Sequence, residues 1–503
     1  MDSDKGVHPQ VAFFAACTVR RLFVAQVFQQ TRGQFMNDQK QPGNPSRRRF
    51  LGALAAGAGA ITLGTHPDFF RAAAWAGGAE GLERTKLSLG FIPLTDCAPL
   101  VMAYEKGYFR KYGLDVTVAK EASWANIRDK VSVGELDGGH MLAGMPIAAS
   151  LGVGATRRPT VTAFSMDLNG NAITVSNDLY DRMLEADPEA MAERPMTARA
   201  LKKVIDADKA AGREPMTFAM VFPVSTHNYE LRYWMAAAGI DPDQDIRLIV
   251  IPPPQMVANL RARNIDGYCV GEPWNERAVD AGIGRVVITN YEIWNNNPEK
   301  VLGFNQDWVE RYPTTHKALL MALIETNRWM DDPANRMEVV ETISQRRWVN
   351  APVDVVKMSM TGTFKYAPDE EPRQLPDFNV FYRYAATFPW RSHAEWFLTQ
   401  MIRWGQVETP IDIRAEAARV YRTDLYREAA RALGIAYPTV DHKTEGDRAE
   451  PWMLEAASAP IAMGPDRFFD GNRFDPTDLL AYIDGFAVHN RKVAMADLAA
   501  MNA

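Results

Sequence analysis

A regular alternation of strand-like and helical segments, beginning at residue 86, constrains this chain more than any other feature. Residues 86–93 alternate apolar and polar side chains as a strand does, and residues 98–112 then carry apolar side chains at helical spacing. The same order repeats through residue 151. Strands that alternate with helices at this pitch form a parallel sheet whose strands are joined by crossover helices. The sequence therefore predicts an α/β lobe.

A second run of the same alternation, over residues 197–270, predicts a second α/β lobe. Between the two runs, the polar and glycine-containing segment 167–171 interrupts the apolar rhythm, as a hinge between lobes does. We expect the chain to return to the first lobe after residue 271, with strands at 284–289 and 300–304. The chain would then cross between the lobes twice.

The rest of the chain is predicted to be largely helical. From residue 312 to residue 437 helical spacing dominates, with loops rich in Trp, Pro and Arg between the helices, whereas residues 438–503 are more irregular. The expected organisation is an N-terminal extension and leader at 1–76, lobe I at 77–170, lobe II at 171–271, the return to lobe I with its helical region at 272–437, and a tail packed on the lobes at 438–503.

The N-terminal region has the pattern of an export signal. Residues 46–51 read Ser-Arg-Arg-Arg-Phe-Leu, and a short alanine- and glycine-rich stretch with further small residues follows. A basic start, a short apolar run and then small residues are typical of a signal peptide, and adjacent arginines are typical of the twin-arginine route. The apolar run is shorter than the roughly 20 residues of a membrane span. We therefore expect export by the twin-arginine translocase and a soluble periplasmic protein, with Met1 or Met36 as the start; the alternative is a basic turn before a buried helix.

Charge and cysteine content exclude several classes of protein. The 56 Lys and Arg residues face 62 Asp and Glu residues, so the net charge is −6, which argues against an extended nucleic-acid-binding surface. The three cysteines are far apart in the sequence, and their spacing supports neither a disulfide framework nor a thiolate metal cluster. Nucleic acid is not an expected partner.

Catalytic and cofactor motifs are missing from the sequence. It contains no G-x-S-x-G elbow, no H-E-x-x-H pair, no phosphate-binding G-x-x-x-x-G-K-[ST] loop and no dinucleotide fingerprint outside the leader. The eight histidines are scattered, and no two of them lie within four residues, which excludes a helical metal pair. We therefore predict no catalytic residue, no metal and no cofactor, and a protein that is not an enzyme.

Three residues at element ends are candidates for binding a ligand, because open α/β sheets bind ligands there. Trp124 follows Ser123, a predicted N-cap, and a helix N-terminus suits a small anion; alternatively Trp124 is a core aromatic behind a capped helix. His227 lies at a strand-to-helix junction, where a histidine either binds a ligand or packs as a cap. Lys300 lies where a polar loop gives way to an apolar strand, a place where most lysines are solvated.

Seven short phrases, taken in order, closely resemble the periplasmic nitrate/bicarbonate-binding proteins of ABC importers. The phrases are residues 94–99, 105–109, 123–130, 134–138, 140–146, 225–234 and 270–274. The resemblance runs from about residue 86 to residue 478, and the twin-arginine leader suits that family as well. It implies a two-lobed type II periplasmic binding protein that closes over one small oxyanion and delivers it to a membrane permease and its ATPase, for nitrate transport and assimilation.

The resemblance also implies which residues would bind the anion. They are Trp124, Asn171, His227, Lys300 and the backbone of Val270 and Gly271. Nitrate carries one negative charge and no proton, so its pocket should present only hydrogen-bond donors. The bicarbonate branch carries an acidic residue where this chain has Lys300, so the lysine favours nitrate, with nitrite as competitor. Nitrate binders usually have glutamine where this chain has the shorter Asn171.

Other classes remain open at this point. A bicarbonate-binding importer component and a cytoplasmic nitrate sensor belong to the same family, and the sensors lack an export leader. The thiamine-pyrimidine synthases share the fold, but they use a cysteine-rich iron motif that this chain lacks. Aliphatic sulfonate binders are related importer components, but membership of that class would not explain why the phrases around Trp124 and His227 occur together in this chain.

Overall fold

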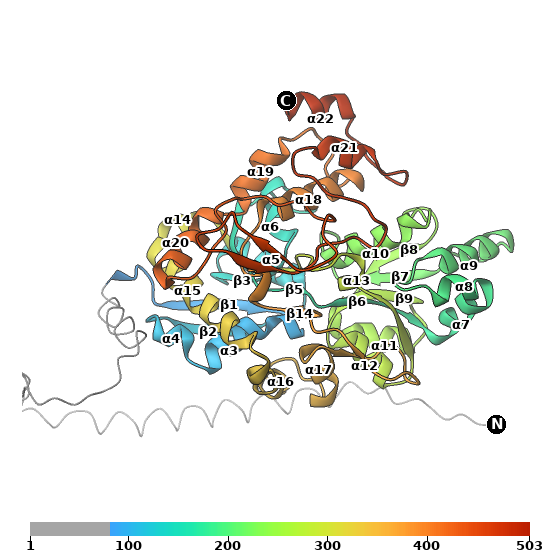
Figure 1. Ribbon diagram of the computed structural model, residues 1–503, viewed down its shortest axis with the longest axis horizontal. Coiled ribbons are helices and arrows are strands. Elements are labelled where there is room, and N and C mark those ends of the chain that lie inside the picture. Colours follow the sequence, from blue (N-terminus) through green and yellow to red (C-terminus); the bar gives the residue numbers. More distant parts are fainter. Residues whose placement is uncertain (1–80, 503) are drawn as a thin grey trace, which may run out of the picture. The chain divides into compact units, whose positions relative to one another are not determined.

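The computed structural model describes residues 81–502 (Figure 1). The predicted leader and N-terminal extension at residues 1–76 lie outside this range, and the leader stays a prediction. Within residues 81–502, no helix combines the length and the apolar character that crossing a membrane requires.

The first sheet has the strand order β2-β1-β3-β11-β4. Its strands are β1 (Lys86–Phe91), β2 (Asp115–Lys120), β3 (Gly138–Leu142), β4 (Thr160–Ser165) and β11 (Lys300–Asn305). The helices that follow or cover them are α3 (Ala98–Glu105), α4 (Tyr108–Lys111), α5 (Trp124–Val133), α6 (Met145–Leu151), α14 (Gln306–Arg311) and α15 (Pro313–Met330). Strand β1 runs parallel to β2 and β3, as the alternation predicted, whereas β11 runs antiparallel to β3 and β4.

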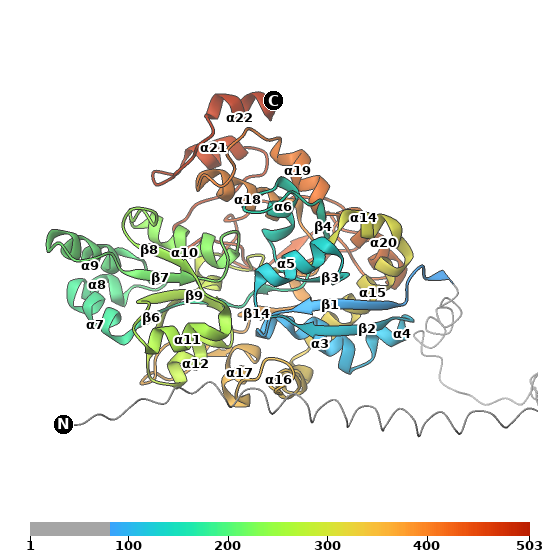
Figure 2. The ribbon, with the colours of Figure 1, turned by 180° about the vertical axis from the view of Figure 1, so that it is seen from behind.

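The second sheet has the strand order β10-β6-β9-β7-β8 (Figure 2). Its strands are β6 (Asn171–Ser176), β7 (Thr217–Met220), β8 (Arg247–Val250), β9 (Gly267–Gly271) and β10 (Gly284–Thr289). Its helices are α7 (Asn177–Ala186), α8 (Pro188–Ala192), α9 (Arg199–Ala210), α10 (Thr226–Ala237), α11 (Met256–Arg261) and α12 (Trp274–Asp280). We expected residues 284–289 in the first lobe, and this is wrong: β10 pairs with β6 in the second sheet. The lobe boundaries themselves stay predictions.

The two sheets are mixed rather than parallel because two strands begin where the chain crosses between them. Strand β6 begins at Asn171, opposite Gly271 at the end of β9, and therefore runs antiparallel to β9. Strand β11 begins at Lys300, opposite Leu142 at the end of β3, and therefore runs antiparallel to β3. A strand that enters a sheet from the edge where its neighbours end must run against them. Each crossing thus places the first residue of a strand between the two sheets.

The crossings are held together by a short ribbon and by asparagine side chains. Strand β5 (Leu168–Asn169) in the first crossing pairs antiparallel with β14 (Asn379–Val380). The Asn169 amide donates to the Asp377 carbonyl oxygen at 2.7 Å, and its Oδ1 accepts from the Asn297 backbone N–H at 3.1 Å. Because residue 297 belongs to the second crossing, this asparagine ties the two crossings to each other.

The C-terminal part is largely helical, as predicted, and contacts elements of both sheets. Its elements are α16 (Arg336–Ile343), α17 (Val353–Met360), α18 (Arg391–Arg403), α19 (Ile413–Val420), α20 (Thr423–Leu433), α21 (Leu479–Asp484) and α22 (Met495–Met501), with the two-stranded pairs β12 (Thr363–Phe364) with β13 (Arg373–Gln374) and β15 (Trp452–Leu454) with β16 (Ile461–Met463). Trp396 and Phe397 on α18 pack against Tyr229 on α10. Helix α19 contacts α6 and β4. Residues of both sheets therefore share one apolar core with the C-terminal helices.

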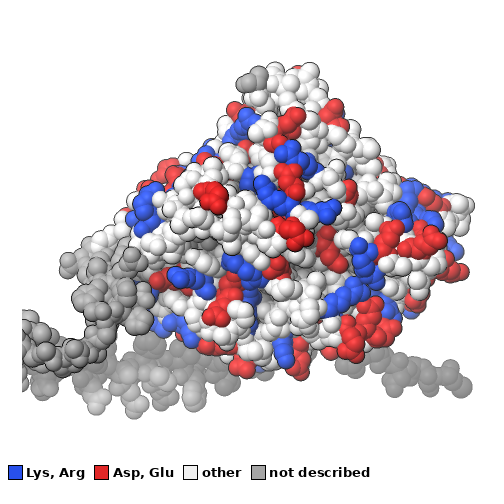
Figure 3. Space-filling model, in the orientation of Figure 1, with Lys and Arg blue, Asp and Glu red and all other residues white. Residues whose placement is uncertain are grey.

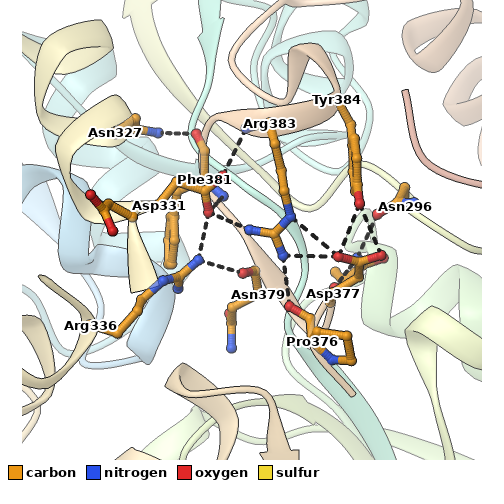
Figure 4. A network of polar contacts seen from close by, with 12 residues as sticks. Asn296, Asn327, Asp331, Arg336, Pro376, Asp377, Asn379, Phe381, Arg383 and Tyr384 are labelled. Atoms are coloured by element: carbon orange, nitrogen blue, oxygen red, sulfur yellow. Dashed lines mark hydrogen bonds and ion pairs between the residues drawn. The ribbon is translucent and has the colours of Figure 1, made fainter. Parts of the chain in front are cut away.

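A network of paired charges fixes the segment around β14 (Figure 4). Asp331, at the end of α15, accepts from Arg336 at 2.6 Å and from Arg383 at 2.7 Å. Arg383 also bonds Asp377 at 2.9 Å, so that two guanidinium groups meet two carboxylates. The Asn327 amide donates to the carbonyl oxygens of Phe381 and of the residue that follows β4, both at 2.8 Å. This network, here called the β14 network, anchors the C-terminal segment to the first crossing.

Candidate functional site

The structure brings the predicted site residues together at the junction of the two sheets. Trp124 is the first residue of α5, His227 lies in the first turn of α10, and Lys300 is the first residue of β11. Asn171 begins β6 and pairs with Gly271 at the end of β9. All five residues are buried. The Lys300 ammonium lies 5.7 Å from the centroid of the Trp124 ring system.

Two N-caps position the aromatic and the histidine; the sequence predicted the first, Ser123, but not the second, Ser225. The Ser123 hydroxyl accepts from the Asn126 N–H at 3.2 Å and begins α5. The Ser225 hydroxyl accepts from the Asn228 N–H at 3.0 Å and begins α10. Capping fixes the direction in which the first residues of each helix point. Trp124 and His227 are therefore placed by local structure on either side of the junction.

Val270 and Gly271 contribute main chain at the end of β9. The Val270 carbonyl oxygen accepts from the Asn275 amide at 2.7 Å, and its side chain is in the core. Gly271 lies where a Cβ would stand 3.2 Å from Asn171 Oδ1 and 3.5 Å from Asp96 Oδ2. A side chain there would intrude among the site residues. That these two backbones bind a ligand stays a prediction.

Two carboxylates that the sequence reasoning missed contact Lys300. Its ammonium donates to Asp96 Oδ2 at 2.7 Å and forms an ion pair with Glu299 Oε1. The expected pocket lined by donors alone is therefore wrong. Asp96 follows β1 in a turn and Glu299 immediately precedes β11, and charged residues in turns resemble solvated ones. The presence of Asp96 within the family phrase 94–99 and the adjacency of Glu299 to Lys300 were the available signals.

The charges of Asp96 and Lys300 stabilise each other. Burial alone would raise the pKa of Asp96, but Lys300 and His140 lower it to about 2. Burial alone would lower the pKa of Lys300, but Asp96, Glu299 and Asp167 raise it above its usual range. At neutral pH the site therefore contains a buried aspartate and a buried ammonium, 2.7 Å apart.

His140 supports Asp96 as a neutral imidazole. Its Nδ1 accepts from the Ile92 backbone N–H at 3.4 Å, so its proton is on Nε2, which lies 3.0 Å from Asp96 Oδ1. Burial lowers the pKa of His140, in spite of the nearby Asp96. The His140 ring also packs edge-on against Trp124, with 5.0 Å between centroids. This histidine, on β3, was quoted in the sequence phrases but not predicted as a site residue.

His227, Glu230 and Asp167 are held neutral by burial. Burial lowers the pKa of His227 to about 4, so its imidazole is uncharged at neutral pH. Burial raises the pKa values of Glu230 and Asp167 well above their usual range, aided by neighbouring carboxylates. Asp167 Oδ1 accepts from the Lys300 backbone N–H at 3.0 Å. His227 Nε2 lies 3.4 Å from Glu299 Oε1.

Several buried polar atoms of the site have no hydrogen-bond partner within residues 81–502. They are Thr95 Oγ1, Asp96 Oδ1, Trp124 Nε1, His140 Nε2, Asp167 Oδ2, the amide nitrogen and oxygen of Asn171, both ring nitrogens of His227, both carboxyl oxygens of Glu230 and Glu299 Oε2. Roughly nine in ten buried polar groups in proteins have a protein or water partner, so these atoms are available to bond a ligand or ordered water. Trp124 and Asn171 offer N–H donors beside an ammonium, which is the chemistry that binds a small anion.

No group of side chains in the described residues could hold a metal ion, and the face drawn in Figure 3 shows no broad basic patch. No cluster of three or more His, Cys, Asp or Glu side chains within residues 81–502 has the geometry to bind a metal ion. On the face drawn in Figure 3, acidic and basic side chains are interspersed. The chemistry of this region is thus concentrated in the buried site.

Comparison with known proteins identifies a family and its relatives. The model of the NMT1-like family matches residues 80–344. Nitrate/nitrite-binding protein NrtA of Nostoc sp. is 34% identical over 88% of this chain and 98% of its own length. The crystal structure of the periplasmic nitrate-binding protein NrtA from Synechocystis has a TM-score of 0.70 and 34% identity, and the match covers 81% of this chain and all of that one.

Two further relatives carry different names. The nitrate import ATP-binding protein NrtC of Synechocystis sp. is 43% identical over 82% of this chain, which spans only 57% of the length of NrtC. The bicarbonate-binding protein CmpA of Synechococcus elongatus is 33% identical over 82% of this chain and 89% of its own length.

Proposed function

This chain belongs to the NMT1-like family, and on that premise we propose that it is the periplasmic substrate-binding component of an ABC importer. The proposed ligand is nitrate, or nitrite, captured for uptake and assimilation. Relatives named for nitrate and nitrite binding match the chain over most of its length. This supports a binding protein rather than an enzyme.

The observation that carries the proposal is a buried ammonium beside unpartnered N–H donors. Lys300 supplies the positive charge, and Trp124 Nε1 and Asn171 Nδ2 supply neutral donors that lack partners among the described residues. Nitrate has three acceptor oxygens and one negative charge, so each donor can bond an oxygen, and the bond to Lys300 is charge-assisted. Removal of the anion from water must be offset by several such donors. Trp124, Asn171, His227, Lys300, Val270 and Gly271 are the proposed ligand-binding residues.

Closure of the two lobes would couple binding to a change of shape. At the edge of the site, the Thr95 N–H donates to the Glu272 carbonyl oxygen at 2.8 Å, and Trp274 Nε1 donates to the Pro93 carbonyl oxygen at 3.2 Å. These bonds join the segment that follows β1 in the first sheet to the segment that follows β9 in the second sheet. An anion that bonds both sides favours the arrangement in which they meet. The permease would then recognise the closed form.

Bicarbonate is the second candidate, and a specific observation favours it. Asp96 and Glu299 are hydrogen-bond acceptors next to Lys300, and bicarbonate, unlike nitrate, can donate its proton to one of them. A relative named for bicarbonate binding fits this reading. Nitrate remains the first choice because Lys300 stands where the bicarbonate branch has an acidic residue.

The proposed partners are the permease and ATPase of the importer, with the twin-arginine translocase during export. The similarity to part of an ATP-binding protein named for nitrate import supports a shared transport system. A cytoplasmic nitrate sensor of the same family is the remaining alternative. Fractionation of cells that produce the full chain distinguishes the two, because a sensor stays in the cytoplasm.

A thermal-shift panel on the full chain tests the proposed ligand. Nitrate, nitrite, bicarbonate, an alkanesulfonate and cyanate are compared, each with and without calcium. A ligand at 100 times its Kd stabilises the folded state by about 2.7 kcal/mol, so nitrate is expected to raise Tm at millimolar concentrations and cyanate is not. A rise with bicarbonate alone would transfer the assignment to the second candidate, and no rise with any anion would contradict the proposal.

A further inference from the structure

The ionisable groups around Lys300 contain more acid than base. In the described part of the chain, Lys300 is the cation of this cluster, and it faces carboxyl groups from four directions. The groups are Asp96 in the 3-10 turn η3 (Thr95–Cys97), His140 on β3, Asp167 between β4 and β5, His227 and Glu230 on α10, the thiol of Cys269 on β9, Glu299 before β11 and Lys300 on β11. The site therefore has no excess positive charge to neutralise the charge of a bound anion.

Asp96 already balances the Lys300 charge. Their 2.7 Å contact is between two fully buried groups, and His140 Nε2 lies 3.0 Å from the other Asp96 oxygen. Glu299 contacts the same ammonium through Oε1, while its buried Oε2 has no partner among residues 81–502. An ionised Glu299 would be a second negative charge against one ammonium, and a bound anion would be a third. Uncompensated charges in a buried site are costly.

Nitrate makes this conflict sharper because it accepts hydrogen bonds and donates none. Glu299 Oε2 would present a lone pair to the bound nitrate. A neutral His227 whose N–H points away from the nitrate would present a lone pair as well. A single proton shared by these two groups, whose Oε1 and Nε2 atoms lie 3.4 Å apart, removes one negative charge and adds one donor. With this shared proton, the Glu299 and His227 pair would offer a hydrogen-bond donor to the bound nitrate in place of two acceptors.

We propose that His227, whose Nε2 lies 3.4 Å from Glu299 Oε1, takes up one proton from solution as the anion binds and shares it with Glu299, so that this site captures nitrate together with a proton. This inference rests on the proposed function, because it concerns the same site and an acceptor-only anion. Atoms and charge balance: one anion and one proton enter, and the net charge of the site is unchanged.

The other titratable groups are poor candidates for this proton. Lys300 and His140 lower the pKa of Asp96 to about 2 despite its burial, so Asp96 stays ionised. Burial raises the pKa values of Asp167 and Glu230 well above the usual range, so both carry a proton before binding. Burial lowers the pKa of His227 to about 4, which leaves it able to gain a proton when an anion approaches.

The proton count distinguishes the two candidate ligands. Nitrate must bind with an added proton, so its affinity should fall as pH rises, by about tenfold per pH unit where one proton is taken up. Bicarbonate has the same net charge but brings a proton that it can donate to Glu299, so we expect it to take up less than one proton from solution. The number of protons taken up on binding therefore distinguishes the two anions even where their affinities are similar.

Titration calorimetry of the full chain with nitrate measures this uptake. The titration is repeated between about pH 6 and pH 8.5 in buffers of different ionisation enthalpy, whose effect on the heat reports the protons exchanged. We expect uptake of about one proton and a Kd that rises about tenfold per pH unit in the upper part of the range. Glu299→Gln keeps an acceptor for Lys300 and adds an N–H donor, so its proton uptake should fall close to zero and its Kd should become independent of pH.

A matched control is Glu338→Gln, which removes a carboxylate that is paired with Lys106 on the surface and leaves the site unaltered. It should retain the wild-type uptake of one proton. Nitrate binding by the wild-type chain without proton uptake would overturn the proposal, as would undiminished uptake by Glu299→Gln. The wild-type count decides by itself if the variant does not fold. Failure of every anion to bind would instead contradict the proposed function.

Discussion

The chain contains two polar clusters, one partly exposed and one buried, that differ in how their charges are matched. In the β14 network, Arg336 and Arg383 face Asp331 and Asp377, two cations against two anions (Figure 4). Around Lys300, one ammonium faces four carboxyl groups, and several donors and acceptors have no partner within the described residues. The four charges of the first cluster pair with one another, although Arg336 Nη1 and Asn327 Oδ1 lack partners among the described residues, whereas we propose that the second cluster is completed by an anion and a proton. This difference in charge matching distinguishes the proposed binding site from the β14 network.

The difference has a physical origin in the cost of buried charge. Asp331 accepts hydrogen bonds from two guanidinium groups and from the backbone N–H groups of Phe381 and Arg383. A charge that is satisfied in this way stabilises the segment that it holds. Glu299 Oε2 and the His227 ring nitrogens have no such partners among residues 81–502. The fold tolerates this cost at the site, where ligand binding can recover it.

Loss of the cation from each cluster should produce the largest contrast. Lys300→Met leaves Asp96 and Glu299 without their cation, and removal of one partner from a buried pair costs about 3–5 kcal/mol of stability. It should also weaken nitrate binding at least about 100-fold, because a charge-assisted contact is lost. Arg336→Met breaks the buried contact with Asp331, but Asp331 keeps Arg383 and two backbone N–H donors, so this variant should destabilise the chain by less, about 1–3 kcal/mol. Its nitrate affinity should remain that of the wild type.

Chemical denaturation and calorimetric titration of both variants check these expectations. Methionine is preferred to glutamate at position 300 because a glutamate would put a further carboxylate beside Asp96 and Glu299. If Arg336→Met lost nitrate affinity as severely as Lys300→Met, the distinction between a structural network and a binding site would fail.

The sequence predicted the positions at element ends better than the contacts between them. Trp124 and His227 stand out because N-caps and strand-to-helix junctions are local patterns that short stretches reveal. Asp96 and Glu299 were missed because their role depends on contact with Lys300, which the fold brings to Asp96 from 204 positions away. Strand β10 was assigned to the wrong sheet because partner strands are chosen by tertiary packing and not by local alternation.

The β14 network shows the same limit. Asp331 and Arg383 are separated by 52 positions, and nothing in their local sequence marks them as partners. Charged residues at the end of a helix and in a loop normally face solvent. What the sequence did indicate is the general order of the elements, because strand and helix periodicity are read over ten or fewer residues. Charge pairing across the chain is a property of the completed fold.

A smaller effect should follow from removing one unpartnered donor of the site. Trp124→Phe keeps an aromatic ring next to His140 but deletes Nε1, which has no partner in the described part of the chain. A hydrogen bond to a charged group contributes about 1.5–3 kcal/mol, so nitrate affinity should fall about 10- to 150-fold. Stability without nitrate should change little.

The matched control for this variant is Trp404→Phe. Trp404 Nε1 is also buried without a partner among residues 81–502, but it stands at the end of α18, away from the site. Its loss should leave nitrate affinity unaltered in the same calorimetric titration. Equal affinities for wild type and Trp124→Phe would remove the indole from the proposed ligand shell.

The smallest expected effect tests whether the site, unlike the β14 network, depends on close approach of the two lobes. Gly144 precedes α6 with an ordinary φ of −75°, so its backbone does not require glycine. A Cβ at this position would clash with the carbonyl oxygen of Val224, in the loop that leads into α10. Gly144→Ala should therefore disfavour the closed arrangement by about 1 kcal/mol and weaken nitrate binding about fivefold.

Stability in the absence of nitrate is the discriminating measurement for Gly144→Ala. If the added methyl group acts only on the approach of the lobes, Tm without nitrate should stay close to the wild-type value while the nitrate-induced rise in Tm shrinks. Gly81→Ala is the control, because a Cβ at Gly81 meets nothing within 4 Å. Tm in the absence of nitrate could instead fall in proportion to the loss of nitrate affinity. The contact between Gly144 and Val224 would then stabilise the fold, as the β14 network does. Lobe closure would in that case depend on other residues at the boundary of the site.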